Sequence, residues 1–352
     1  MDGFKCFDKI FYYPATMPDQ VIESDLFRSF LKSHFDYDTV RQRTDVVFVF
    51  PTSVKKVYTH ALLEKHADKK IVFVYWGENI FGYFRLVSQV HAVLRKLNLS
   101  SSFIDALLFN PIMRLLLGLK SPMQTDTYFK DIVKQAAPNH YFILTNKLKN
   151  ASPRVFFAPY FYYFNQGHVK KILSKPVMTT AAPRKFCAFI VSNPNNLDRI
   201  DFFKKLSRYK TVDSFGKVLN NKSLNDLNKD HIIADYQSND LVYQQYKFVV
   251  CFENSYAEGY VTEKIINAIA GGAIPLYRGA PDVATYFNAA RVVNYDACGS
   301  YDSMVNAIIA LDQDEERYRQ FVNQPVFNQD IAQDLTVHNN QLAGFLGNLL
   351  HA

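Results

Sequence analysis

The sequence predicts an α/β protein with two doubly wound, Rossmann-like domains that face a cleft. Three observations support this prediction: short continuous apolar runs of strand length, amphipathic helices between them, and a stretch without periodicity that separates two such series. Continuous rather than alternating apolarity is typical of parallel strands that are covered on both faces. The chain has 352 residues, which is enough for about two domains.

The first series predicts an N-terminal domain over residues 1–160. Its strand candidates are residues 45–51, 70–76, 139–145 and 153–160. Between the first two strands, residues 53–68 have the pattern of a helix, with Val54, Val57 and Leu62 on its inner face. This strand–helix–strand order favours a parallel sheet.

Two further segments do not fit the strand and helix pattern of this domain. Residues 82–138 carry seven basic and three acidic residues, a net charge of +4, together with apolar runs, so we expect an inserted helical segment. Its role stays open between a cover for the cleft, contact with an anionic membrane, a dimer contact and additional structural helices. Residues 161–183 show no clear period and end in proline and small residues, which predicts a linker.

The second series predicts a C-terminal domain over residues 184–352. Its strand candidates are residues 186–192, 209–215, 247–252, 273–277 and 291–294, and its helix candidates include 260–270 and 302–310. In the first of these helices Val261, Ile265 and Ile269 form one apolar stripe, and Gly271 ends the helix. The final segment, QLAGFLGNLLHA, is a candidate amphipathic helix that could pack across the domains.

A polar turn leads from one of these strands into the helix at 260–270. It combines hydrogen-bond acceptors with a cation at a helix N-terminus, where free N–H groups favour an anion. Its polar residues are Glu253, Asn254, Tyr260, Thr262, Glu263 and Lys264. Lys264 and Arg199 each lie in the first turn of a predicted helix, where the helix dipole disfavours a cation. A phosphate-bearing ligand with a sugar attached would explain both.

These residues also have purely structural interpretations. Arg199 can be a surface arginine, Lys264 can pair with a neighbouring acid, and Tyr260 can be a packing residue. Asn254 suits a turn by its own chemistry, and Thr262 is a candidate helix cap to which we assign no chemical role.

The charge, cysteine and apolar patterns disfavour several classes of protein. The net charge of +7 is scattered and accompanies no DNA- or RNA-binding motif, so we expect no nucleic-acid partner. The Asp-x-Asp pairs at 36–38 and 312–314 do not follow clear buried strands, so we expect no metal site. Four distant cysteines without a CxxC motif fit a reducing compartment. The sequence has no signal-peptide core, and it has no apolar run as long as the roughly 18 residues needed to span a membrane. We therefore expect a cytoplasmic protein.

Three segments resemble the alpha-1,3/4-fucosyltransferase family, in particular its bacterial type. They are CFENSYAEGYVTEKIINAIAGGAIPLYRGAP at 251–281, FIVSNPNNLDRIDFFKKL at 189–206 and VYWGEN at 74–79. The resemblance is dense over 185–310 and thinner over 45–80 and 139–165. It implies the GT-B architecture, with the acceptor mostly on the first domain and GDP-fucose on the second. Arg278 departs from the family, because relatives often have a bulky apolar or aromatic residue there.

The resemblance implies an inverting fucosyltransferase of protein glycosylation. It would move L-fucose from GDP-fucose to a hydroxyl of N-acetylglucosamine in a lactosamine-type glycan, with an alpha-1,3 linkage favoured over alpha-1,4. Another GT-B transferase with a different nucleotide sugar, or an inactive glycan- or nucleotide-binding protein, stays open. Neither the acceptor nor the oligomeric state follows from the sequence, and peripheral membrane contact is a further possibility beside a cytoplasmic location.

The resemblance also implies roles for single residues. Glu78 would be the catalytic base, and Arg199 and Lys264 would offset the charge of the leaving diphosphate, so that no metal cofactor is required. Glu263 would accept hydrogen bonds from sugar hydroxyls, and Tyr260 would contact a phosphate or the nucleotide. Asn254, the remaining donor-site residue, would hold the ribose or the backbone of the turn.

Overall fold

The computed structural model describes somewhat more than half of the chain. The described residues are 30–31, 33–36, 45–49, 68–75, 137–145, 147–148, 152–164, 166–174, 184–192, 196–223, 239–254, 256–328 and 330–350. Contacts divide the chain into two units, Met1–Ala158 with His338–Ala352, and Pro159–Val337. The helix expected at 53–68 and the insertion expected at 82–138 lie outside the described residues.

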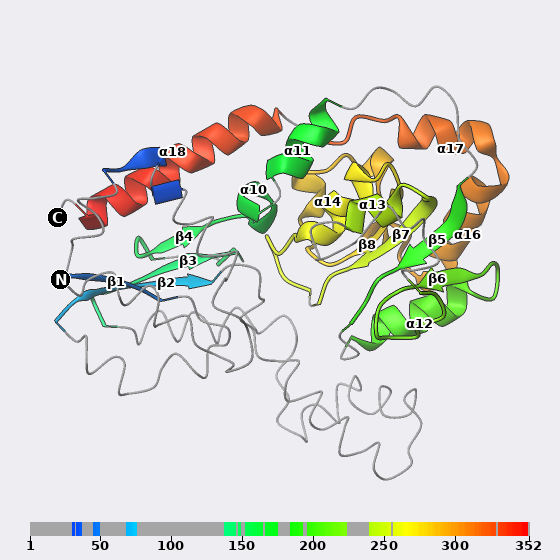
Figure 1. Ribbon diagram of the computed structural model, residues 1–352, viewed down its shortest axis with the longest axis horizontal. Coiled ribbons are helices and arrows are strands. Elements are labelled where there is room, and N and C mark those ends of the chain that lie inside the picture. Colours follow the sequence, from blue (N-terminus) through cyan, green and yellow to red (C-terminus); the bar gives the residue numbers. More distant parts are fainter. Residues whose placement is uncertain are drawn as a thin grey trace, which may run out of the picture. The chain divides into compact units, whose positions relative to one another are not determined.

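The first unit contains a four-stranded parallel sheet in the order β1-β2-β3-β4 (Figure 1). Its strands are β1 (Val46–Val49), β2 (Lys70–Tyr75), β3 (His140–Leu144) and β4 (Val155–Phe157). Ile71 to Val74 are all buried, although successive side chains of a strand point to opposite faces. Both faces of β2 are therefore covered, and the expected buried parallel strands are confirmed.

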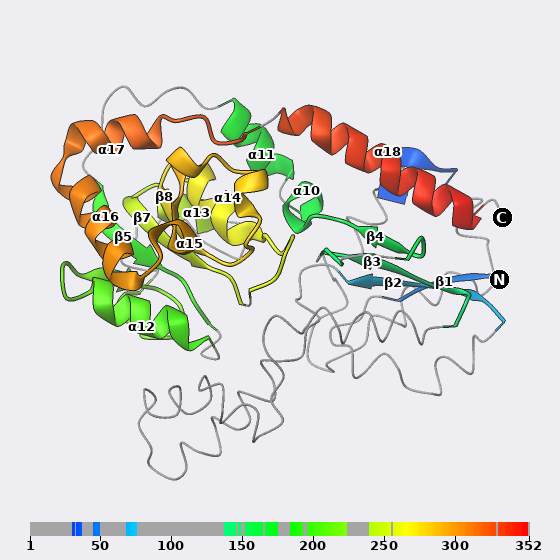
Figure 2. The ribbon, with the colours of Figure 1, turned by 180° about the vertical axis from the view of Figure 1, so that it is seen from behind.

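The last helix, α18 (Ile331–Leu350), is divided between the two units. Its part from His338 onward groups with the first unit and lies beside β3 and β4 (Figure 2). The Phe345 ring is 5.5 Å from that of Phe156, and Lys70 Nζ donates a hydrogen bond to the Leu349 carbonyl at 2.9 Å. The chain therefore returns to its first unit after completing the second.

The second unit contains a five-stranded parallel sheet in the order β6-β5-β7-β8-β9. The strands are β5 (Lys185–Phe189), β6 (Val212–Ser214), β7 (Tyr246–Phe252), β8 (Ile274–Arg278) and β9 (Val293–Asn294). The helices are α12 (Leu197–Leu206), α13 (Asn239–Tyr243), α14 (Glu263–Ala270), α15 (Tyr295–Cys298), α16 (Tyr301–Gln313) and α17 (Glu315–Val322), with 3₁₀ turns at Val283–Thr285 and Ala289–Arg291.

This sheet is covered on both faces, as a doubly wound fold requires. Phe248, Val250 and Phe252 alternate along β7 and share one core cluster with side chains of α12, α16 and α17. The intervening Val249 and Cys251 are buried on the opposite face, where α14 packs against β7 and β8. Each unit is thus an α/β layer structure with a parallel sheet, as the sequence predicts.

The segment expected to be a linker at 161–183 contains two helices. They are α10 (Tyr160–Phe164) and α11 (Gln166–Leu173), and α11 packs against α14 of the second unit. Lys171 on α11 forms an ion pair of 2.5 Å with the buried Asp240 on α13. The sequence did not reveal α11 because only Val169 and Ile172 form its buried face, which is too few for a clear period.

The strand order also fixes where a ligand would bind. The chain leaves β5 for α12 on one face of the sheet and leaves the adjacent β7 for α14 on the other. In open α/β sheets such a reversal opens a crevice at the carboxyl ends of the two strands. Here β5 ends at Phe189 and the adjacent β7 ends at Phe252, so the switch point lies at these two strand ends. Among the described residues, no helix has the length and apolarity that crossing a membrane requires.

Candidate functional site

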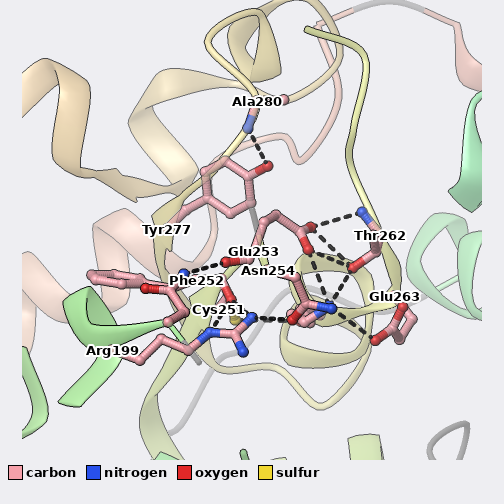
Figure 3. Close-up of polar contacts among 11 residues, drawn as sticks. Arg199, Cys251, Phe252, Glu253, Asn254, Thr262, Glu263, Tyr277 and Ala280 are labelled. Atoms are coloured by element: carbon pink, nitrogen blue, oxygen red, sulfur yellow. Dashed lines mark hydrogen bonds and ion pairs between the residues drawn. The ribbon is translucent and has the colours of Figure 1, made fainter. Parts of the chain in front are cut away.

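Arg199 lies at this switch point, in the first turn of α12 and in contact with the end of β7. Its side chain is buried, with 3% of its surface exposed, so it is not a surface arginine. Its guanidinium donates from Nε to the Phe252 carbonyl at 2.9 Å, from Nη2 to the same carbonyl, and from Nη2 to Asn254 Oδ1 at 2.7 Å (Figure 3). The arginine therefore ties the start of α12 to the end of β7.

The other terminal nitrogen of Arg199 is not used in these contacts. Nη1 makes no hydrogen bond within the part of the chain that the structure describes, and Figure 3 shows it directed away from Phe252 and Asn254. Burial lowers the pKa of Arg199, and the nearby Glu253 opposes this shift. A buried guanidinium without a carboxylate in direct contact is suited to binding an anion.

Glu253 is the centre of a second set of contacts, directly after β7. Its side chain is fully buried, and both carboxylate oxygens accept hydrogen bonds. Oε1 accepts from the Thr262 N–H at 2.8 Å, and Oε2 accepts from the Thr262 hydroxyl at 2.7 Å and from Lys264 Nζ at 3.1 Å (Figure 3). Thr262 occupies the N-cap position of α14, but its hydroxyl does not cap the helix because it is bound to Glu253.

Lys264 lies between two carboxylates. Its ammonium is 3.1 Å from Glu253 Oε2 and 3.3 Å from Glu263 Oε1. Burial lowers the pKa of Lys264, but the two carboxylates outweigh it and the net shift is upward. Burial raises the pKa of Glu263, but Lys264 outweighs it and the net shift is downward. Both groups are therefore charged at neutral pH, and both reach solvent, with 25% and 22% of their side chains exposed.

The two sets of contacts are joined through the backbone of Glu253. The Asn196 side chain, at the start of α12, donates from Nδ2 to the Glu253 carbonyl at 2.8 Å. The Glu253 N–H donates to the Arg278 carbonyl of β8 at 2.8 Å. The structure thus places Arg199, Asn254, Glu263 and Lys264 at one edge of the sheet, and their contact with a donor stays a prediction.

The structure gives a different result for each of the other residues singled out in the sequence, Tyr260, Glu78 and Arg278. Tyr260 is fully buried, so packing accounts for its position, and a contact with the nucleotide stays a prediction. Glu78 lies outside the described residues. Arg278 forms an ion pair with Asp198, and its guanidinium lies 4.5 Å from the centre of the Tyr295 ring, so it ties β8 to α12.

Sequence reasoning assigned no role to Glu253 or Asn196. The available signal for Glu253 was its position, because an acid that directly follows a buried parallel strand lies at the edge where ligands bind. At the Asp-x-Asp pair 312–314, Asp312 binds Lys210 at 3.0 Å and Asp314 caps α17. No group of three or more potential metal ligands (His, Cys, Asp or Glu) occurs among the residues that the structure describes.

The two parallel α/β sheets, with a polar cluster at the switch point of the second, are the arrangement expected for the GT-B fold. Residues 181–332 match the family model described as glycosyltransferase family 10 (fucosyltransferase) C-term. The predicted resemblance to fucosyltransferases is therefore confirmed.

Individual relatives agree with this assignment. The chain is 36% identical over 135 residues to the alpha-(1,3)-fucosyltransferase FucT of Helicobacter pylori, a match that covers 38% of this chain and 26% of the relative. It is 34% identical over 127 residues to GDP-fucose protein O-fucosyltransferase 3 of Xenopus laevis, covering 36% of this chain and 27% of the relative. The chain thus matches about a quarter of the length of these relatives.

Solved structures show the same fold. A crystal structure of alpha1,3-fucosyltransferase with GDP-fucose aligns with a TM-score of 0.54 and 21% identity, covering 88% of this chain and 79% of the other. A structure of alpha1,3-fucosyltransferase with GDP aligns with a TM-score of 0.59 and 19% identity, covering 100% of this chain and 98% of the other. These similarities confirm the predicted fold class.

Proposed function

We propose that this protein is a fucosyltransferase that uses GDP-fucose as its donor. The observation that carries the proposal is the buried Arg199, whose Nη1 is available at the switch point of a glycosyltransferase family 10 domain. Lys264 supplies a second cation at the same edge of the sheet. Two cations at this edge suit a diphosphate, because charge-assisted hydrogen bonds to phosphate oxygens are strong and arginine offers them in a planar fork.

We propose an inverting reaction, in which the acceptor hydroxyl displaces GDP in one step. The GDP leaving group gains negative charge in the transition state, and Arg199 and Lys264 would stabilise that charge. Asn254 would hold Arg199 in place through its 2.7 Å hydrogen bond. Glu263, with 22% of its side chain exposed beside Lys264, is positioned to accept hydrogen bonds from hydroxyls of the donor.

The hydroxyl that attacks must lose a proton, so the reaction needs a base. We assign this role to Glu78 on the strength of the Trp-Gly-Glu-Asn motif in which it lies. Its replacement by glutamine removes the carboxylate at nearly constant size. If Glu78 is the base, GDP-fucose binding persists in that variant and turnover is lost; turnover at the native rate would refute the assignment.

For the acceptor we propose N-acetylglucosamine in a lactosamine-type glycan, with an alpha-1,3 linkage. This is supported by the match to the alpha-(1,3)-fucosyltransferase of Helicobacter pylori. A second candidate is transfer to a protein hydroxyl, which the match to GDP-fucose protein O-fucosyltransferase 3 of Xenopus laevis favours. Both candidates share the donor and differ only in the acceptor.

One experiment separates these candidates. The full chain is incubated with GDP-fucose and a panel of lactosamine-type glycans and serine- or threonine-containing peptides, and the products are analysed for the position of the new bond. Fucose on the 3-hydroxyl of N-acetylglucosamine supports the first proposal, and fucose on a peptide hydroxyl supports the second. Titration calorimetry with GDP-fucose, GDP-mannose and UDP-sugars tests the donor, and binding without any turnover would favour an inactive binding protein.

We also propose a cytoplasmic location. Cys187 and Cys251 are buried free thiols, as in proteins of reducing compartments, and burial raises the pKa of both thiols, which keeps them protonated. Fractionation of the native source tests the proposal. Recovery in the soluble fraction supports it, and release from membranes only at high salt would indicate peripheral membrane contact instead.

A further inference from the structure

We propose that Glu253 is a positioning residue, whose buried carboxylate fixes the Lys264 ammonium where it meets the donor diphosphate. This inference rests on the proposed function for the identity of the ligand. It assigns Glu253 no contact with the donor, because its side chain is fully buried and its carboxylate is bound to Thr262 and Lys264.

The first argument is the number of contacts that Glu253 makes with the start of α14. A lysine side chain has four flexible bonds and loses considerable conformational freedom when it is held in one position. Glu253 holds Lys264 directly at 3.1 Å and also through the Thr262 hydroxyl, which accepts from Lys264 Nζ at 2.9 Å. It also accepts the Thr262 N–H, so one carboxylate orders both the lysine head group and the backbone that precedes it.

The second argument is that Glu253 is itself fixed. Its backbone N–H donates to β8 and its carbonyl accepts from Asn196 at the start of α12, each at 2.8 Å. The residue thus connects β8, α12 and α14 while Arg199 binds the carbonyl of the preceding Phe252. A single rigid segment therefore sets the positions of both cations that the proposed reaction needs.

The third argument comes from Gly279 in the turn after β8. A Cβ atom at this position would lie 2.5 Å from Glu253 Cγ and 2.6 Å from the Tyr277 hydroxyl oxygen, far closer than van der Waals contact. The Tyr277 hydroxyl cannot easily move, because it accepts the Ala280 N–H at 3.0 Å. Only glycine therefore leaves Glu253 its observed position, and alanine would displace the carboxylate.

Positioning and simple electrostatics make opposite predictions for Glu253→Gln. Removing a negative charge next to Lys264 makes the site more positive and should strengthen binding of an anion if placement does not matter. If Glu253 fixes Lys264, glutamine leaves the ammonium poorly placed and binding weakens. The sign of the change in affinity therefore decides between the two.

The test measures GDP binding to the full chain by titration calorimetry. Positioning predicts that Glu253→Gln weakens GDP binding on the order of tenfold or more, because small displacements of binding groups are costly. Glu315→Gln is the matched control, since it removes one carboxylate from the exposed pair with Lys247 and should leave GDP affinity unchanged. Equal or tighter binding by Glu253→Gln would overturn the inference.

Two further variants keep the test informative if Glu253→Gln folds poorly. Glu253→Asp keeps the charge and shortens the side chain, and Gly279→Ala keeps the carboxylate and displaces it. Positioning predicts weaker GDP binding for both, although the net charge of the site is unchanged. Native GDP affinity in both variants, with melting temperatures close to native, would refute the role.

A second readout does not depend on the ligand. The rate at which acetic anhydride acetylates Lys264, followed by peptide mass spectrometry, reports how tightly the amine is held. We expect slow labelling in the native chain and several-fold faster labelling at Lys264, but not at Lys247, in Glu253→Gln. Unchanged labelling in Glu253→Gln would overturn the inference. If the native chain binds no GDP but Glu253→Gln still shows the faster labelling, the proposed function alone is refuted.

Discussion

Asn254 Oδ1 lies 2.7 Å from Nη2 of Arg199, and this hydrogen bond joins the turn after β7 to the first turn of α12. It therefore joins the two chain segments that follow β5 and β7 at the switch point of the sheet. Because Nη2 is bound on this side, the arginine fork is oriented with Nη1 on the other. The asparagine is thus an orienting partner of a buried cation.

Replacement of Asn254 by alanine should weaken GDP binding. The hydrogen bond to a charged group contributes about 1.5–3 kcal/mol, so we expect a loss of roughly tenfold to a hundredfold in affinity. Titration calorimetry measures it. Asn220→Ala serves as the control, because the Asn220 side chain donates to the Gly216 and Lys222 carbonyls and contacts no residue of the site. Native affinity in Asn254→Ala would contradict the orienting role.

Arg199→Lys should damage both stability and turnover, although it keeps the charge. Lysine has no planar fork and cannot satisfy the Phe252 carbonyl and Asn254 together while presenting a further donor. We expect the free energy of unfolding in urea to fall by about 1.5–3 kcal/mol and kcat/KM to fall roughly a hundredfold. A variant with native kcat/KM would show that Arg199 is structural only.

Removal of divalent metal ions should leave turnover unchanged. If Arg199 and Lys264 neutralise the diphosphate, a metal ion has no required place in the reaction. The measurement compares initial rates in excess EDTA with rates in added Mg²⁺ or Mn²⁺. Loss of turnover in EDTA that Mn²⁺ restores would refute the metal-independent reaction.

The stability of the second unit should depend on pH through Asp240. Burial raises the pKa of Asp240, but hydrogen bonds from His168 and Lys171 outweigh it and the net shift is downward. A carboxyl group with a lowered folded-state pKa contributes stability that is present above its unfolded pKa, about 3.9, and is lost as pH falls through the folded-state value.

We therefore expect Asp240→Asn to lower the free energy of unfolding at pH 7 by about 1–3 kcal/mol. The difference from the native chain should shrink below about pH 4. Urea unfolding at a series of pH values measures both effects. A difference that stays constant down to pH 2 would exclude this linkage.

Replacement of two glycines by alanine should change the stability of the fold in opposite directions. A Cβ atom at Gly216 would lie 2.1 Å from the Val191 carbonyl oxygen, so Gly216→Ala should destabilise the fold by about 1–3 kcal/mol or more. At Gly344, within α18, nothing lies within 4 Å of such an atom, and Gly344→Ala should stabilise the helix by roughly 0.5–1 kcal/mol. Thermal melting of both variants checks the opposite signs.

Much of the second sheet could be predicted from the sequence. The strands expected at 247–252 and 273–277 occur as Tyr246–Phe252 and Ile274–Arg278, because a continuous apolar run bounded by polar residues is a strong local signal. The helix expected at 260–270 begins only at Glu263. The turn before it needs Gly259 in a left-handed conformation, with φ of 76°, and the chain is still extended at Thr262.

The remaining features depend on contacts between distant residues. Helices α13 and α15 have five and four residues, which is too short for a hydrophobic period to be visible. The sequence around Glu253 does not show whether its carboxylate points to solvent or is bound to Thr262. The orientation of this carboxylate is set by the packing of β8 and α14 around it. For the same reason the sequence could predict that the candidate donor-site residues lie near one another, but not which of them form hydrogen bonds with each other.

The division of α18 affects how the chain can fold during synthesis. Residues 338–352 complete the first unit, while residues 159–337 form the second without interruption. The second unit can therefore reach its native contacts as soon as it leaves the ribosome, whereas the N-terminal sheet gains the packing of α18 only after the residues from His338 onward have been made. A nascent chain halted before residue 338 lacks the Phe345 ring that contacts Phe156, so it would expose apolar surface near Phe156. Chaperones could bind this surface until α18 has been made.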